Sequence, residues 1–326
     1  MLLDIFYILA GFLLLVKGGD YLVDGSVALA RRARLSAMVI GMTVVGFGTS
    51  MPEFLVSVQS AIRGSSGLAL GNVVGSNIAN IGLILGLTSL VCPLPSGRRM
   101  LRVDVPFMLV SMAILVGAAS CGVITRWMGV AMAALLVWFI WWEIRRERKS
   151  GRNGSDGLNG TDGEVKEEMP LWRALLLVVL SIAGMVWGAD LLIDGASNLA
   201  LVTGEALGVG REEMERVIGL TVVALGTSLP ELFASVIAAR RGETDMAVGN
   251  IIGSVTFNIL CVVGFASAIT PIGGAWSPFV VDYGMMLVLG VLLWVFLYIG
   301  HRLSRWEGAV LLAIYVGYIA WIGGRL

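Results

Sequence analysis

The chain has 326 residues, of which 57% are hydrophobic and only 14% are charged, with 23 basic residues balancing 23 acidic ones. A soluble protein of this length could not keep so much apolar surface from water, so the composition excludes an ordinary soluble domain and predicts a membrane protein. The near-zero net charge is uninformative about partners, and we expect the bilayer but no nucleic acid among them.

Ten apolar segments follow one another along the chain. About 20 apolar residues cross a bilayer as a helix, whereas strands of an outer-membrane barrel would be about half as long and would alternate in polarity. The first segment has no basic region ahead of it and no clear cleavage site, so we interpret it as a retained helix. The expected spans are 3–29, 37–61, 69–91, 104–121, 126–143, 171–200, 216–239, 246–269, 279–299 and 305–322.

Residues 144–170 interrupt this pattern, because they are rich in charged residues, Gly and Asn and have almost no apolar content. This composition is typical of a flexible linker. It divides the chain into an N-terminal half, 1–143, and a C-terminal half, 171–326. Each half has five spans, an odd number, so the second half crosses the membrane in the opposite sense. The sequence therefore predicts an all-α polytopic membrane protein of ten transmembrane helices, arranged as two inverted five-helix repeats.

The basic residues predict the orientation of these spans. Seventeen of them fall in loops on the side of the linker and five on the other side. Cytoplasmic loops carry the excess of Lys and Arg. We therefore expect a multi-pass protein of the inner or plasma membrane, with a cytoplasmic linker and both termini outside.

The halves share a long repeat, in which residues 41–86 return at 219–264 without a gap and with 22 of 46 positions identical. GMTVVGFGTSMPE (41–53) returns as GLTVVALGTSLPE, and GNVVGSNIAN (71–80) returns as GNIIGSVTFN. The identity centres on polar residues within apolar segments, which packing alone would not require. Inverted repeats are a transporter architecture with a substrate site near the bilayer midplane. The pattern therefore predicts one site built from both halves.

Helix geometry places these polar side chains on shared faces. Residues three or four apart on a helix are neighbours, so Thr49 and Ser50 share a face with Glu53. Pro52 should bend this helix and free carbonyl oxygens of the preceding turn. The next span adds a second polar face, and the second repeat duplicates both faces; these further residues are Asn72, Ser76, Asn80, Thr227, Ser228, Glu231, Asn250, Ser254 and Asn258.

Carboxylates, hydroxyls, amides and carbonyls are hard oxygen ligands, and the motifs contain neither His nor Cys. Such a set suits Ca²⁺ or Na⁺ and argues against zinc, copper or iron. A charge at mid-membrane costs at least about 2.5–3.5 kcal/mol, so Glu53 and Glu231 require a cation or a proton. The hydroxyls can instead bond to their own helices, and Asn72 and Asn250 can simply bridge helices. Four further carboxylates are nearer the helix ends and can have either a structural or a gating role: Asp20, Asp24, Asp190 and Asp194.

At these motifs the chain resembles the cation/Ca²⁺ exchanger superfamily, specifically the prokaryotic Na⁺/Ca²⁺ exchangers. Its paired GTS-x-PE and G-N-x-x-G-S motifs are similar to that family's alpha repeats. The resemblance implies an antiporter with no cofactor and no enzymatic activity, functional as a monomer, whose first and sixth helices slide across a rigid eight-helix core. The ion ligands that it implies are Thr49, Ser50, Glu53, Ser76, Asn80, Thr227, Ser228, Glu231, Ser254 and Asn258, with backbone carbonyls near Gly46 and Ala224.

One departure from the family bears on the coupling ion. Some members have an acidic residue where Asn258 stands, whereas here both equivalent positions, Asn80 and Asn258, are amides. Two carboxylates balance one Ca²⁺ but leave excess positive charge with three or more Na⁺. A Ca²⁺/H⁺ antiporter using the same glutamates is therefore the alternative. A channel would not need inverted halves, and no nucleophile–base pair or cofactor motif suggests an enzyme.

Overall fold

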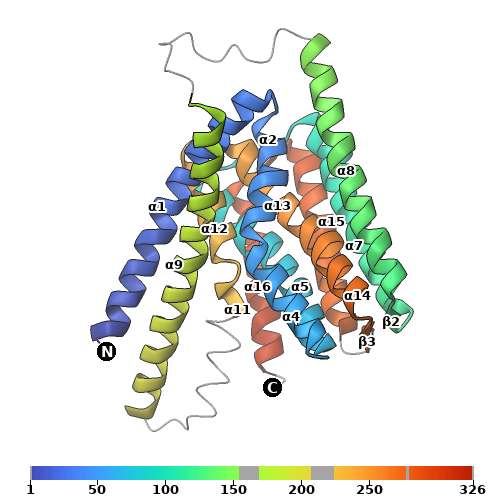
Figure 1. Ribbon diagram of the computed structural model, residues 1–326. Helices are drawn as coiled ribbons and strands as arrows, with labels where there is room; N and C mark the ends of the chain where they lie inside the picture. The colour runs from blue at the N-terminus through green and yellow to red at the C-terminus, as the bar shows by residue number, and fades with distance from the viewer. Residues whose placement is uncertain (1, 154–168, 207–223, 277–278, 325–326) are drawn as a thin grey trace.

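The computed structural model describes residues 2–153, 169–206, 224–276 and 279–324, and within them helices dominate (Figure 1). Eight helices in these ranges are long and apolar enough to cross a membrane, and a bent pair, Ala37–Thr49 with Met51–Ile62, can supply a ninth. The seventh expected span, 216–239, starts outside the described residues, and its described part is the C-terminal one. The prediction of an all-α polytopic membrane protein is confirmed.

The N-terminal half follows the expected order of spans. The second and third spans each combine α-helical and π-helical segments. Its elements are α1 (Leu2–Ala33), α2 (Ala37–Ile40), η1 (Gly41–Val45), α3 (Gly46–Thr49), α4 (Met51–Ile62), α5 (Ser66–Ala79), η2 (Asn80–Leu85), α6 (Gly86–Val91), β1 (Leu94–Pro95), η3 (Met100–Asp104), α7 (Val105–Ser120), β2 (Val123–Ile124) and α8 (Arg126–Asn153).

The C-terminal half repeats this order as far as it is described. Its elements are α9 (Leu171–Ala206), α11 (Ala224–Gly226), α12 (Leu229–Arg240), α13 (Thr244–Phe257), η5 (Asn258–Val263), α14 (Gly264–Ile269), β3 (Ile272–Gly273), α15 (Val280–Gly300), β4 (Arg302–Leu303) and α16 (Arg305–Gly323). Strand β1 pairs with β4 and β2 pairs with β3, both antiparallel, so each small sheet joins one half to the other.

Helix α8 extends further than the sequence suggested. It continues to Asn153, through the range expected to begin the linker, and residues 154–168 lie outside the described ranges. Ion pairs explain the extension, because Arg99 pairs with Glu143 and Glu147 on this helix. Glu147 also accepts a hydrogen bond of 3.2 Å from the backbone N–H of Ser36, directly before α2. Charged residues that suit a linker therefore form a helix that is held to the bundle.

The two halves run in opposite directions. In Figure 1, α1 starts at the lower end and rises towards the end where α8 finishes, whereas α9 starts near that upper end and descends. Both chain ends lie at the lower end of the view. The inverted arrangement of the two repeats follows directly from these opposite directions.

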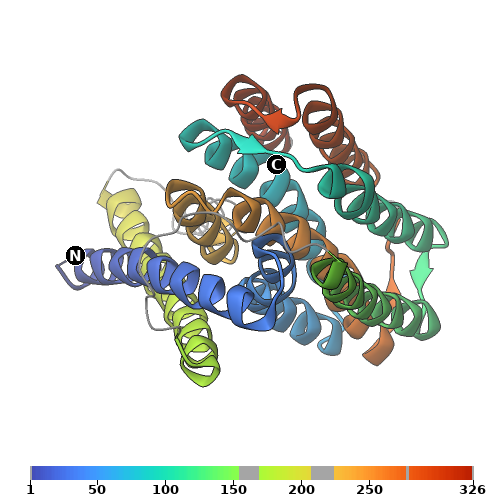
Figure 2. The ribbon, with the colours of Figure 1, turned by 90° about the horizontal axis from the view of Figure 1, so that it is seen from above.

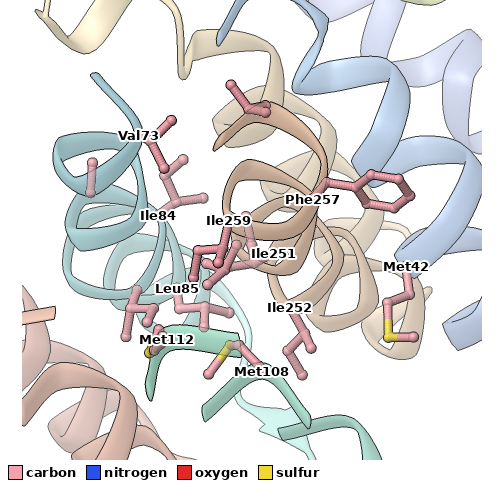
Figure 3. Packing of buried hydrophobic residues seen from close by; sticks show 14 of the residues in the cluster. Met42, Val73, Ile84, Leu85, Met108, Met112, Ile251, Ile252, Phe257 and Ile259 are labelled. Carbon is pink, nitrogen blue, oxygen red and sulfur yellow. The ribbon is translucent and has the colours of Figure 1, made fainter. Parts of the chain in front are cut away.

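The repeat motifs occupy the centre of the bundle. Within an 18-residue apolar stretch of each span, 78% of the residues are buried in Ser66–Val91 and 89% in Thr244–Ile269, compared with 22% in α1 and 28% in α9. In Figure 3, Ile84 and Leu85 of the first of these spans face Ile251 and Ile259 of the second. Dense apolar packing therefore surrounds the polar residues of both repeats.

Helices α1 and α9 lie together on one flank of the bundle (Figure 2). Their crossing depends on glycines: a Cβ on Gly11 would lie 2.8 Å from the backbone nitrogen of Leu192. A Cβ on Gly188 would in turn lie 2.9 Å from the carbonyl oxygen of Gly11. Small residues allow such close helix contacts in membranes. The pair therefore packs as a unit, mostly outside the buried core.

Candidate cation site

The second span of each half is interrupted at the serine of the repeat motif. Helix α3 ends at Thr49 and α4 begins at Met51, with a bend of 47° between the two parts of this span. Ser50 at the break has φ −82° and ψ 7°, and Ser228 in the second half has φ −92° and ψ 5°. A proline opens the helix after each break, where its missing N–H is tolerated. The predicted bend at Pro52 is confirmed.

The two repeat glutamates are completely buried and contact each other's repeat. Ser228 donates a hydrogen bond of 3.2 Å from Oγ to Glu53 Oε1, and Ser50 donates one of 3.1 Å to Glu231 Oε1. Each glutamate lies in the first turn of its helix, α4 or α12, where the positive end of the helix dipole favours a negative charge. The reciprocal bonds show that the halves build this region jointly.

The other predicted hydroxyls surround this pair unevenly. Ser76 Oγ lies 3.5 Å from Glu53 Oε1, whereas Ser254 donates to the carbonyl oxygen of Gly46 at 3.3 Å. Thr49 donates to Asn250 Oδ1 at 3.2 Å and also lies within hydrogen-bonding range of Glu231. Thr227, in turn, lies within hydrogen-bonding range of Glu53. Ala224 lies at the very start of α11, and its role as a carbonyl ligand stays a prediction.

The amide residues of the motifs stand where the core helices change from α to π geometry. Segment η2 begins at Asn80 and η5 begins at Asn258, and both side chains are fully buried. Single π turns inside α-helices are frequent at functional sites. Asn258 donates from Nδ2 to Asn77 Oδ1 at 3.3 Å, whereas neither polar atom of the Asn80 side chain has a partner among the described residues.

Four buried oxygens in this region have no hydrogen-bond partner in the described part of the chain. They are Glu53 Oε2, Glu231 Oε2, Asn80 Oδ1 and Asn258 Oδ1. Buried polar atoms are almost always satisfied, and leaving a charged one unsatisfied is especially costly. Among the described ion pairs, none neutralises either glutamate. The residues present therefore fit a hard cation, which would satisfy oxygens that the protein leaves open.

Asn72 and Asn250 bridge helices, the simpler of the two roles open to them. Their amide nitrogens donate to Ser57 and Ser235, respectively, at 2.9 Å each, and more weakly to the glutamate carbonyl on the same neighbouring helix, at 3.3 and 3.4 Å. The sequence reasoning missed these two serines. Their identity in both repeats, four residues after each glutamate, was the available signal. They fix α4 to α5 and α12 to α13, directly beside the glutamates.

The four remaining carboxylates lie away from this centre. Asp20, Asp24, Asp190 and Asp194 are on α1 and α9, and none of them is buried. Arg241, which follows α12, donates to Asp24 Oδ1 and to the backbone oxygen of Asp20. The structure thus brings the repeat motifs of spans two, three, seven and eight together and keeps these aspartates outside.

Two inverted halves with broken helices that meet at buried carboxylates define the chain as a polytopic membrane transporter built from repeats. A family model described as sodium/calcium exchanger protein matches residues 3–145 and 173–324, and the chain belongs to this family. The family consists of exchangers, so the chain is a transporter and not an enzyme.

Relatives match along nearly the whole chain. The putative antiporter CaxA of Alkalimonas amylolytica is 34% identical over 325 residues, covering 98% of each chain. The sodium/calcium exchanger MaX1 of Methanosarcina acetivorans is 32% identical over 344 residues, covering 96% of each. A solved structure of the sodium-calcium exchanger NCX_Mj, soaked with 10 mM Na⁺ and zero Ca²⁺, has 31% identity, 98% coverage of each chain and a TM-score of 0.79. The similarity thus includes both halves and the linker flanks.

Proposed function

We propose that the protein is a secondary antiporter that exchanges Ca²⁺ for Na⁺ at one site shared by both repeats. The observation that carries this proposal is the set of buried, unpartnered oxygens of Glu53, Asn80, Glu231 and Asn258, divided evenly between the halves. Membership of the sodium/calcium exchanger family and the names of the relatives supply the two ions.

The proposed ligand set extends from these oxygens to the hydroxyls and carbonyls around them. Thr49, Ser50, Ser76, Thr227, Ser228 and Ser254 supply hydroxyls, and Gly46 and Ala224 supply backbone carbonyls. Because Ser254 donates to Gly46, the lone pairs of its own hydroxyl oxygen remain available to a cation, whereas the Gly46 carbonyl also accepts from the backbone N–H of Ser50 at 3.2 Å. Oxygen ligands of this number and kind match the preference of Ca²⁺.

Obligatory exchange follows from the shared carboxylates. A Ca²⁺ ion bridging Glu53 and Glu231 precludes Na⁺ on the same carboxylates, so the ions bind alternately. Carrying bare carboxylates through an apolar environment is costly, which ties the conformational change to an occupied site. Two carboxylates balance one Ca²⁺, and the same count keeps a Ca²⁺/H⁺ antiporter as the second candidate.

Alternating access in this proposal uses α1 and α9 as the moving pair. In the described structure Arg241 pairs with Asp24 on the side where the linker flanks lie. By the repeat offsets, the equivalent residues are Arg63 and Asp194, which form no described ion pair. One side is therefore tied and the other is not, as expected for a transporter open to one side. In the opposite state, we propose, the Arg63–Asp194 pair forms and the Asp24–Arg241 pair opens.

The membrane topology completes the proposal. The halves 1–143 and 171–326 lie on either side of a cytoplasmic linker, and both termini face outside. The excess of basic residues in loops on the linker side supports this orientation. The protein works as a monomer, since each chain supplies both repeats of the site.

Uptake of ⁴⁵Ca²⁺ into proteoliposomes under separately imposed Na⁺ and H⁺ gradients tests the coupling. An outward Na⁺ gradient should drive Ca²⁺ accumulation even when the pH gradient is collapsed. Sustained accumulation driven by a proton gradient in Na⁺-free medium would instead select the Ca²⁺/H⁺ antiporter. Flux that needs no counter-ion and does not saturate would indicate a channel.

A further inference from the structure

Asn77 is a buried amide beside the proposed site that has no counterpart in the second repeat. The equivalent position is Val255, in the aligned repeat segments 71–80 and 249–258. Both residues are 0% exposed. A buried polar residue in an apolar core is costly without partners, so its presence in one repeat alone requires an explanation.

The contacts of Asn77 define its orientation. Its Oδ1 accepts the hydrogen bond of 3.3 Å from Asn258 Nδ2. Its own Nδ2 faces Met286 Sδ at 3.8 Å, and thioether sulfur only accepts. Both contacts therefore give the same orientation of the Asn77 amide, with its oxygen towards Asn258 and its nitrogen towards Met286.

This contact in turn fixes the amide of Asn258. Because its nitrogen is used by Asn77, its oxygen is the end that remains open, and that oxygen is buried and unpartnered. A flipped amide would instead turn N–H donors towards the open end, where they repel a cation. The equivalent Asn80 has no described partner on either end. The two amides of the repeat are thus different: one is held by a neighbour and the other is not.

We infer that Asn77 is a positioning residue that holds the carbonyl oxygen of Asn258 towards the transported cation. This inference rests on the proposed function, because it assumes that Asn258 is a ligand. Neighbours that orient metal ligands typically contribute about 10- to 100-fold to metal affinity. A neutral hydrogen bond belongs at the low end of that range, so we expect about a tenfold effect.

Equilibrium binding of ⁴⁵Ca²⁺ to the purified full-length protein in Na⁺-free buffer tests this inference. Asn77→Val copies the residue of the second repeat and should raise the Ca²⁺ Kd about tenfold. Asn77→Asp keeps an oxygen that accepts from Asn258 and should bind Ca²⁺ at least as tightly as the unmodified protein. Met286→Leu, the matched control, removes only the sulfur contact and should change the Kd less than about twofold.

A melting temperature measured without ions separates positioning from folding. If Asn77 positions Asn258, the rise in melting temperature on adding Ca²⁺ should be smaller in Asn77→Val than in the unmodified protein, whatever the change in ion-free melting temperature. If the valine variant does not fold, Asn77→Ala takes its place. Equal Kd values for Asn77→Val and the unmodified protein would overturn the inference alone. An equal loss in Asn77→Val and Asn77→Asp would overturn it too. Absence of Ca²⁺ binding by the folded, unmodified protein would overturn the proposed function as well.

Discussion

The two repeats bond their glutamates in nearly identical ways but differ where they meet the flanking helices. Around the glutamates, Ser228 bonds to Glu53 as Ser50 bonds to Glu231, with lengths of 3.2 and 3.1 Å. At the flank, the Asp24–Arg241 pair is formed, whereas the equivalent Asp194 and Arg63 form no ion pair among those described. The two equivalently bonded glutamates, here called the symmetric centre, and the one-sided pair at the edge fit the proposal that the ion site stays constant while the access to it differs.

The asymmetric contact is weak enough to be reversible. The side chains of Arg241 and Asp24 are 38% and 46% exposed, and exposed ion pairs contribute about 0.2–1 kcal/mol. The hydrogen bond to Asp24 raises the pKa of Arg241 above its usual value, so the guanidinium keeps its charge throughout the physiological pH range. The buried centre has no such freedom, because each of its bonds lies between packed helices.

The largest expected effect comes from breaking the symmetric centre. Glu53→Gln and Glu231→Gln each remove one of two charges at the site while preserving an oxygen for the partner serine. Ca²⁺ affinity depends on ligand charge, so we expect each variant to lose at least roughly a hundredfold of its exchange rate. Uptake of ⁴⁵Ca²⁺ in proteoliposomes measures this, with the ion-free melting temperature as the control for folding. Normal transport by either variant would end the hypothesis of a shared site.

A smaller effect is expected when a third carboxylate is added to one repeat only. Asn258→Asp should favour fuller Na⁺ occupancy and lower the Na⁺ concentration that half-inhibits Ca²⁺ uptake, by roughly tenfold if the added charge counts fully. Asn80→Asp is the matched variant in the other repeat. Asn258→Asp also removes the N–H group that donates to Asn77, whereas Asn80→Asp removes no described hydrogen bond. The two variants should therefore differ in Ca²⁺ Kd. Unchanged Na⁺ competition in both would contradict the placement of these amides beside the ions.

The sequence allowed the symmetric centre to be predicted, for a physical reason. In a bilayer, spans must be helical and apolar, so ten segments and the polar residues within them stand out. The repeat then identifies which polar residues face a common site. Glu53 and Ser228, in different halves, could be expected to meet on this ground alone.

Other details of the structure could not be predicted in this way. Asn77 has Val255 as its counterpart and so lacks any signal from the repeat. The π turns beginning at Asn80 and Asn258 occur in both repeats, but their hydrogen bonds span one residue more than those of an α-helix, which no residue type specifies. The extension of α8 to Asn153 depends on ion pairs with Arg99, a residue distant in sequence.

The flanking contact predicts an effect of a few-fold. Loss of the pair in Arg241→Ala should shift the balance between the two access states by up to about fivefold. Disulfide trapping shows the states directly. Asp24→Cys with Arg241→Cys should cross-link in one state, and Arg63→Cys with Asp194→Cys should cross-link in the other, with ions changing the ratio of the two products. If only the first pair ever cross-links, whatever the ion conditions, α1 and α9 do not alternate as proposed.

The smallest effect is expected at the linker, which should influence neither ion selectivity nor the symmetric centre. Positive charge in loops places its side in the cytoplasm, so Ser155→Cys should resist impermeant thiol reagents added to intact cells. Cys92, Cys121 and Cys261 must first be replaced. Arg63→Cys, exposed after α4 towards the opposite end of the bundle, is the matched control and should react. Labelling at 155 without labelling at 63 would invert the topology. The Asp24–Arg241 pair would then close the outer side of the protein and not the inner one.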